Sequence, residues 1–347
     1  MTDDSDFPRP GLPAELRDAI APRTVALVIG VLLLQLAFIL SYVGAFHSPK
    51  PHHIPVGVVA PGQAGPQLVA KLNALPDAPV RARVVADESA ARAGLRDGSL
   101  SAALLVNPSG TNDRLLIASG GGTSVATAVE QIADRVEAAQ HRSVQVSDVV
   151  PLQSGDNRGL TGFYLVIGWI VGGYLVAAAL GVAKGARPAT LRRGLIRLGS
   201  LVPYAIASGL FGALIVDQLL GALTGHLVAL WWLGALAVFG AAAVTMAFEV
   251  LFGIVGIGIT VLVFVVLGNP SAGGAYQAAL LPPFWRALSS ALPTGAATDT
   301  VRRIVYFGAH GITGHLVVLA IYAAAGAAVA LGASWLNQRR SAPAASR

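Results

Sequence analysis

Cysteine is absent from the 347 residues of the sequence, and charged residues are scarce. The first absence excludes disulfide bonds, thiolate metal ligands and a cysteine nucleophile. Charged residues make up 12% of the chain, whereas soluble domains carry about 25%. Together with a mean hydropathy of +0.65, this composition predicts an integral membrane protein.

Familiar catalytic motifs are also missing. The sequence has no HExxH, GxSxG or Walker GxxxxGK(S/T) pattern, so we expect no catalytic residues, no cofactor in this chain and no enzyme activity. His52 and His53 have no further ligand at a useful spacing, and we expect a linker there and no metal site. Gly120–Thr123 could precede a phosphate-binding helix but lacks lysine. We interpret it as a glycine turn into a helix capped by Thr123 or Ser124.

Six segments are long and apolar enough to cross a bilayer, whose core takes about 20 helical residues. A signal peptide is the rival interpretation of the first segment, but the run is long and five acidic residues precede it. We expect a short interfacial helix around Pro13–Ala21, within an N-terminal part at 1–23. The predicted spans are 24–45, 161–183, 200–222, 229–250, 252–268 and 314–336, the last five forming a membrane domain at 161–336 with a tail at 337–347.

The charge pattern sets the expected orientation in the plasma membrane. Residues 184–199 contain five basic residues and no acidic one, which by the positive-inside rule places this short loop in the cytoplasm. Alternation then puts the N- and C-termini in the cytoplasm and 46–160 and 269–313 outside. The formal charge of +6 follows from such loops, and we expect no nucleic-acid partner.

The predicted external segment, 46–160, alternates short β-rich runs with helical patterns. Such alternation indicates a small α/β domain. The expected strands are 54–61, 80–86, 101–106 and 114–119, and the expected helices are 64–75, 88–97 and 123–142.

Two acidic residues, Asp217 and Glu249, fall near the ends of predicted spans. Intramembrane carboxylates indicate proton or cation relays. Both residues are shallow and have no obvious partner in the sequence, so we favour side chains that reach the membrane surface or cap a loop. Gly168 and Gly172 have the spacing of a close helix contact.

Residues 281–308 (LPPFWRALSSALPTGAATDTVRRIVYFG) are apolar but interrupted by prolines. Pro283 suits a helix start, and Pro293 should end that helix. Thr298 or Asp299 can cap a second helix. We predict two short helices that form a re-entrant hairpin before the last span.

The order of one span, an external α/β domain and five spans resembles the ABC-2-type transporter permeases, and within them the YhgE/Pip-like branch. Residues 94–108 resemble the family's external domain, and 252–303 carry the longer match. Gln277 departs from it, because the family usually has proline after the preceding aromatic. The matching residues are Ser271, Gly273, Gly274, Leu281, Pro282, Phe284, Trp285, Leu292 and Pro293.

This resemblance implies an exporter of a hydrophobic or amphipathic substrate, such as a lipid, drug or envelope precursor. It implies a homodimer or paired half-transporter in the lipid bilayer, with ATP used by a separate ATP-binding subunit. The loop that docks on this subunit would include Leu191, Arg192, Arg193, Leu195 and Arg197, although a basic amphipathic helix on the membrane surface has the same pattern. The hairpin would be an outer gate made of Gly273, Gly274, Pro282, Pro283, Phe284, Trp285, Pro293, Arg302 and Arg303.

Two other functions remain open at this point. The chain could be a non-transporting envelope scaffold or binding protein of YhgE/Pip type. It could also be a proton-coupled carrier that uses Asp217 or Glu249.

Overall fold

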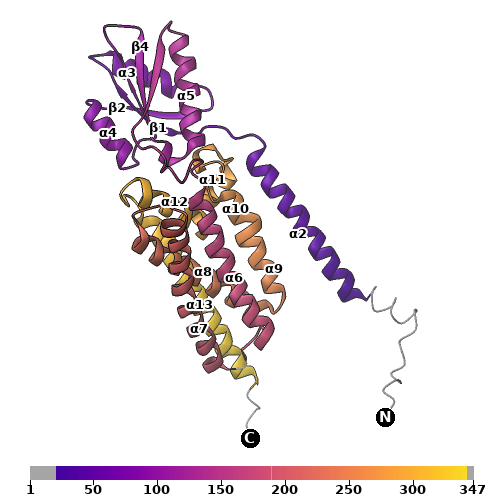
Figure 1. The fold of residues 1–347 in the computed structure, drawn as a ribbon. Coiled ribbons are helices and arrows are strands. Elements are labelled where there is room, and N and C mark those ends of the chain that lie inside the picture. Colours follow the sequence, from indigo (N-terminus) through magenta and orange to yellow (C-terminus); the bar gives the residue numbers. More distant parts are fainter. Residues whose placement is uncertain (1–20, 189, 342–347) are drawn as a thin grey trace, which may run out of the picture.

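The computed structural model describes residues 21–188 and 190–341 (Figure 1). An α/β domain lies at one end of a long helical bundle, and helix α2 (Pro22–Phe46) approaches the junction from the side. α2 begins and α13 (Thr313–Ser341) ends at the opposite end of the molecule. Apart from Ala21, the interfacial helix expected around Pro13–Ala21 lies outside the described residues, as do the last six residues of the expected tail.

The α/β domain is built on a five-stranded sheet of order β2-β1-β3-β4-β5. β1 is parallel to β2 and β3, β4 is antiparallel to β3, and β5 is parallel to β4. Parallel connections need crossover segments, which α3, α4 and α5 supply. The strands are β1 Ile54–Val59, β2 Val80–Val84, β3 Ala102–Leu105, β4 Asn112–Ile117 and β5 Ser143–Asp148, and the helices are α3 Ala64–Asn73, α4 Glu88–Arg96 and α5 Thr123–Ala138.

Apolar side chains cover both faces of this sheet. Ile54 and Val58 of β1 are fully buried against α3 and α5. On the other face, Ala103 of β3 and Leu116 of β4 pack against α4. Alternation along each strand places successive side chains on opposite faces, which explains why strands β1 to β4 were visible in the sequence.

Strand β5 was not predicted. Its sequence, SVQVSD, is polar, and the strand lies at the sheet edge with mostly exposed side chains. Val144 and Val146 alternate with polar residues, but they are the only apolar residues of the strand and are too few to distinguish it from a loop. The predicted cap of α5 was wrong as well, because Gly122 is the N-cap and no side chain caps this helix.

A buried carboxyl pair joins α5 to β4. Arg142 donates two hydrogen bonds to Asp113, at 2.7 Å from Nε and 2.5 Å from Nη2, and the Asn107 amide donates a third at 2.6 Å. Glu137 lies beside them with 1% of its surface exposed. Burial, and then the neighbouring Asp113 carboxylate, raise the pKa of Glu137 from 4.5 to about 7.

The stability of the α/β domain should therefore depend on pH. Because the folded-state pKa of Glu137 exceeds its ordinary value, the stabilisation is complete below about pH 4.5 and is lost as the pH rises through about 7. We expect the free energy of local unfolding to fall by roughly 2–4 kcal/mol between about pH 5 and pH 8. Hydrogen–deuterium exchange of α5 and β4 amides, corrected for intrinsic rates, measures this fall.

Glu137→Gln should abolish that fall, because it removes the titrating group and keeps the shape. Asp134→Asn, on an exposed position of α5, should leave it unchanged. A wild-type profile without slope in this window would contradict the assignment.

Five helices within the described residues are long and apolar enough to cross a membrane, so the chain is a helical membrane protein. The segment expected to span at 252–268 is an apolar helix of the same length, shifted by three residues to Val255–Ser271 and shorter than the five long helices. It has a π-helical stretch at Leu262–Leu267 between α9 and α10. The third span starts at residue 191, nine residues before its predicted start. The helices not yet given are α6 Thr161–Lys184, α7 Leu191–Leu214 (continued by a π-turn, Ile215–Leu219), α8 Leu227–Phe252, α9 Val255–Val261, α10 Gly268–Ser271, α11 Pro283–Ala291 and α12 Pro293–Tyr306.

Helix α8 occupies the centre of the bundle, and α6, α7 and α13 pack around it. Glycines bring the backbones close: a Cβ at Gly173 would lie 2.5 Å from the Val238 carbonyl oxygen, and one at Gly326 would lie 2.6 Å from the Val244 nitrogen. Gly168 has nothing within 4 Å of its missing side chain. The helix contact inferred from Gly168 and Gly172 is therefore wrong at Gly168, and small-residue packing operates at Gly173.

Candidate functional site

A helical hairpin of α11 and α12 lies where the bundle meets the α/β domain (Figure 1). The single residue Leu292 separates the two helices, and Pro293 begins α12. The expected caps Thr298 and Asp299 are wrong, because both residues lie inside α12. Proline at the first helical position lacks the amide proton that would otherwise have no partner, so the same residue ends one helix and starts the next.

Helix α12 is buried against α6, α8 and α13. The hydroxyl of Thr294 donates to the Gly268 carbonyl of α10 at 3.0 Å, while Thr298 and Thr300 donate to carbonyls of their own helix at 2.8 and 2.7 Å. These bonds satisfy the polar groups that burial would otherwise penalise. α12 is thus part of the bundle core.

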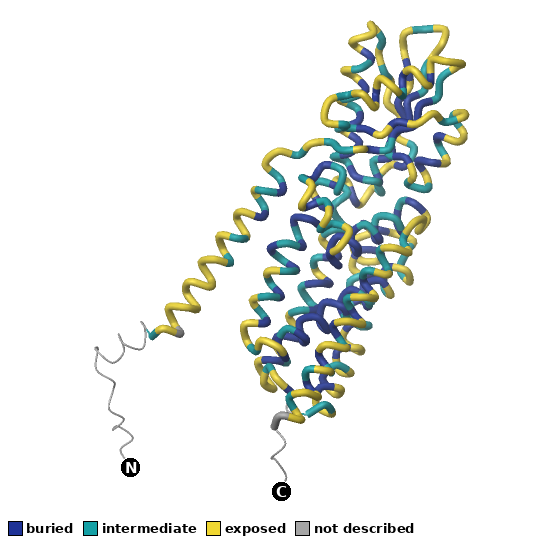
Figure 2. Tube along the Cα trace, turned by 180° about the vertical axis from the view of Figure 1, so that it is seen from behind, coloured by how far each residue is buried: buried dark blue, intermediate teal, exposed yellow. Residues whose placement is uncertain are grey.

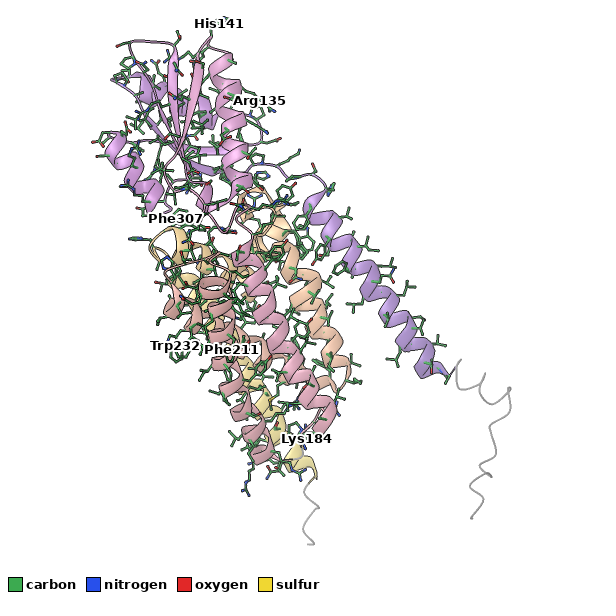
Figure 3. The ribbon with its side chains drawn as sticks, viewed as in Figure 1. Arg135, His141, Lys184, Phe211, Trp232 and Phe307 are labelled. Atoms are coloured by element: carbon green, nitrogen blue, oxygen red, sulfur yellow. The ribbon has the colours of Figure 1, made fainter. Side chains whose placement is uncertain are left out.

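Residues just before and just after this hairpin are buried in the α/β domain. Leu280, just before α11, is buried in the cluster under α5. Phe307, just after α12, is buried in the cluster under α4 on the other face of the sheet and is labelled at the junction in Figure 3. The α/β domain therefore contacts the chain on both sides of the hairpin. A movement of the hairpin relative to the domain requires these buried side chains to repack.

The glycine turn before α5 makes this approach possible. A Cβ at Gly120 would lie 2.7 Å from the Tyr306 ring, and one at Gly121 would lie 3.1 Å from Phe307. A side chain at Gly122 would overlap Gln277, and its φ of +138° also favours glycine. The turn is a docking surface for the hairpin flanks, which supports the turn interpretation over a phosphate site.

Asp156 stabilises the same junction through hydrogen bonds. It is 4% exposed and accepts hydrogen bonds from the Tyr306 hydroxyl at 2.8 Å and from Thr161, at 2.9 Å for the amide and 2.7 Å for the hydroxyl. One carboxylate thus joins the end of α12 to the start of α6.

Removing this carboxylate should loosen the junction measurably. We expect Asp156→Ala to lower the free energy of unfolding by about 2–3 kcal/mol, because it leaves buried donors unpaired. Tyr306→Phe removes one hydroxyl and should cost about 1 kcal/mol. A double-mutant cycle by thermal unfolding isolates the bond between them, and additive effects of the two changes would contradict a direct interaction.

A cavity of about 430 Å³ lies between the hairpin and the α/β domain. Asp299 in its wall accepts from Arg303 Nε at 2.7 Å, and Arg302 donates to the Gly273 carbonyl at 2.8 Å. Arg286 of α11 also lines the cavity and adds a third guanidinium group. Three arginines face one aspartate, so the cavity carries excess positive charge.

The other predicted gate residues have separate roles. Gly274 lies against the Phe163 ring, which a Cβ would approach to 2.7 Å. Pro282 and Pro283 form the N-terminus of α11, and Trp285 packs with Ala45 of α2. Phe284 is 59% exposed.

A buried ion pair lies at the end of the bundle that is far from the α/β domain. Arg197 of α7 pairs with Glu249 of α8, and their side chains are 8% and 0% exposed. Arg197 also donates to the Ala177 carbonyl of α6 at 2.7 Å. The sequence-based view that Glu249 lacks a partner was wrong.

Room for this pair comes from Gly181, where a Cβ would overlap the Glu249 carboxylate. Arg197 itself lies on the buried stripe of α7. The four-residue spacing of small and apolar residues after it was the sequence signal that could have identified its position. The stripe consists of Gly194, Arg197, Leu201, Ala205, Gly209 and Ala213.

The other candidate docking residues lie in the first two turns of α7. Thr190 caps this helix by accepting from the Arg193 amide at 3.2 Å, and Gln338 of α13 accepts from the Leu191 amide at 2.8 Å. Arg192, Arg193 and Leu195 are exposed. The predicted loop is therefore largely helix, with Arg197 turned into the bundle.

Asp217 does not join Glu249. It is 6% exposed in the π-turn after α7, where the Gln218 amide donates to it at 3.1 Å. That turn is at the α/β end of the bundle, and Glu249 is at the other end. Within the described residues, no group of three His, Cys, Asp or Glu side chains could hold a metal ion.

Comparison with known proteins adds one match. A family model described as "ABC-2 family transporter protein" matches residues 23–332. Searches of curated proteins and of solved structures returned no match.

Proposed function

The chain belongs to the ABC-2 family of transporter proteins, because the family model covers most of its length, and we propose that it is the permease subunit of an ABC-2-type exporter. The family supports a membrane permease role. We further propose that the substrate is hydrophobic or amphipathic, and that a separate ATP-binding subunit supplies the energy. Assignment to the YhgE/Pip-like branch stays a prediction from residues 252–303.

The proposed topology has six spans, with Val255–Ser271 as the short fifth one and both termini in the cytoplasm. A span shorter than about 20 residues can cross where the bilayer thins or where neighbouring helices surround it. The basic residues at 184–199 support a cytoplasmic position for that end of the bundle. The α/β domain then lies outside.

The proposed coupling path starts at the exposed turns of α7. Leu191, Arg192 and Leu195 form the surface for the ATP-binding subunit. The buried pair of Arg197 and Glu249 transmits movement of α7 to the central helix α8. α8 packs on α12, so the same movement reaches the hairpin gate under the α/β domain.

We propose that two copies of the chain form the working unit. Helix α2 supports this, because many of its large apolar side chains are exposed along its length (Figure 2). Lipid or a second permease chain has to cover such a surface in a membrane. Homodimerisation would place a shared path between the two bundles.

The proposed function is tested by co-purification and transport. The chain, extracted in mild detergent, should bring down a protein with a Walker motif and stimulate its ATP hydrolysis after reconstitution. Leu191→Ala with Arg192→Glu should weaken this association, while Arg135→Glu on the external helix α5 should not. If no ATP-binding subunit associates, and deletion of residues 50–155 abolishes binding of an envelope partner, the scaffold function replaces the exporter function.

A further inference from the structure

A groove of about 570 Å³ opens between the end of α6 and the start of α7. It lies at the end of the bundle far from the α/β domain, where Figure 3 labels Lys184. Its lining includes the cations Lys184, Arg187 and Arg193 and the apolar residues Leu180, Pro188 and Ile196. One small volume thus joins a cationic surface to an apolar surface.

The three cations have no counterion among the described residues. Asp217, Glu249 and Asp299 are the acidic residues between positions 161 and 341. Asp217 and Asp299 lie at the other end of the bundle, and Arg197 pairs with Glu249. Arg187 donates to the Leu251 carbonyl at 3.1 Å, which leaves its charge without a neutralising partner. Clustered cations of this kind attract an anion.

The apolar side chains of the groove indicate which kind of anion it binds. Leu180 belongs to the membrane-spanning helix α6, and Ile196 is 62% exposed on α7. Helices α6 and α7 are both long and apolar enough to cross a membrane, so lipid is the nearest apolar partner for these side chains. A ligand that satisfies both surfaces carries a phosphate beside an alkyl chain.

We propose that this groove binds one anionic phospholipid of the surrounding membrane. Lys184, Arg187 and Arg193 contact the phosphate, and the acyl chain lies along Leu180 and Ile196. Basic pockets between membrane helices at headgroup level bind anionic lipid headgroups by this combination. This site is separate from the proposed transport path.

The groove also connects to the buried ion pair. Arg197 Nη1 lies 3.4 Å from the carbonyl oxygens of Gly185 and Ala186, which belong to the segment between α6 and α7. A lipid that holds Lys184 and Arg187 therefore stabilises the segment against which Arg197 is positioned. Bound lipid should raise the thermal stability of the whole bundle.

The test compares lipid retention by the full chain, without any ATP-binding subunit. Purified protein is incubated with phosphatidylglycerol or phosphatidylcholine in detergent, and bound lipid is counted by native mass spectrometry. We expect selective retention of phosphatidylglycerol, which inorganic phosphate does not displace. Lys184→Gln with Arg193→Gln should weaken this retention by roughly twenty-five-fold, about fivefold for each cation.

The matched control is Arg192→Gln with Arg339→Gln, which removes the same charge outside the groove and should retain the lipid. Thermal unfolding without lipid verifies that both double variants fold. Equal retention by the groove variant and the wild type overturns the proposal, as does displacement of the lipid by inorganic phosphate. Unchanged lipid retention by the groove variant, together with its lost association in a separate pull-down with the ATP-binding subunit, would assign the groove to a protein partner instead.

Discussion

Replacing Arg197 with methionine should lower the free energy of unfolding by about 3–5 kcal/mol, because it leaves the Glu249 carboxylate buried without a partner. Glu249 is fully buried in α8, and Gly181 provides the space that the carboxylate fills. Thermal unfolding of the purified protein in one detergent measures this change. Among the substitutions considered at this end of the bundle, we expect this one to have the largest effect.

The double variant Arg197→Met with Glu249→Leu is the decisive control. Replacing both members of a buried ion pair with apolar residues is often neutral, so most of the lost stability should return. Arg192→Met changes an exposed arginine in the first turn of the same helix and should have little effect. If Arg197→Met unfolds at the wild-type temperature, the ion pair does not hold α7 against α8.

Replacing Gly295 with alanine should disrupt the α11–α12 hairpin that we propose as the gate. Gly295 lies in the first turn of α12, and a Cβ there would overlap the backbone carbonyl oxygen of Ser289 in α11. A backbone atom cannot rotate away as a side chain can, so the two helices must separate. We expect a loss of roughly 3 kcal/mol in unfolding free energy, and a loss of export that exceeds the loss of folded protein.

Gly168→Ala serves as the matched control, since nothing lies within 4 Å of the added methyl group. It should be neutral or slightly stabilising, because alanine is the better helix former. Export and unfolding temperature are measured in parallel for both variants. Wild-type export by a folded Gly295→Ala protein would contradict a gating role for the hairpin.

Local sequence patterns predicted the parts of the fold that depend on local chemistry. Strands β1 to β4 were recognisable by their alternating apolar residues. Helices α3 to α5 were recognisable because each buries one apolar face on the sheet. Strand β5 was not, because two valines among polar residues at an exposed sheet edge are a weak strand signal. Pro293 marked the break in the hairpin, yet the start of α12 was misplaced because Thr298 and Asp299 have the composition of caps.

The long-range contacts of the candidate site could not be predicted from a single sequence. Arg197 and Glu249 are 52 positions apart, and only the packing of α7 on α8 brings them together. Gly120–Gly122 had the appearance of an ordinary turn, whereas the structure places Tyr306, Phe307 and Gln277 against it. Residue types alone did not indicate which surface would approach these glycines.

In the proposed mechanism, ATP hydrolysis in a partner subunit moves the hairpin relative to the α/β domain. The absence of cysteine allows two spin labels to be placed without removing native thiols, at Gln131→Cys on α5 and Ala287→Cys on α11, which are both exposed. Pulsed electron paramagnetic resonance then measures the distance between the labels in the reconstituted complex. We predict a second distance population during ATP turnover that disappears when hydrolysis is blocked, whereas an identical single distribution in both conditions would contradict the account.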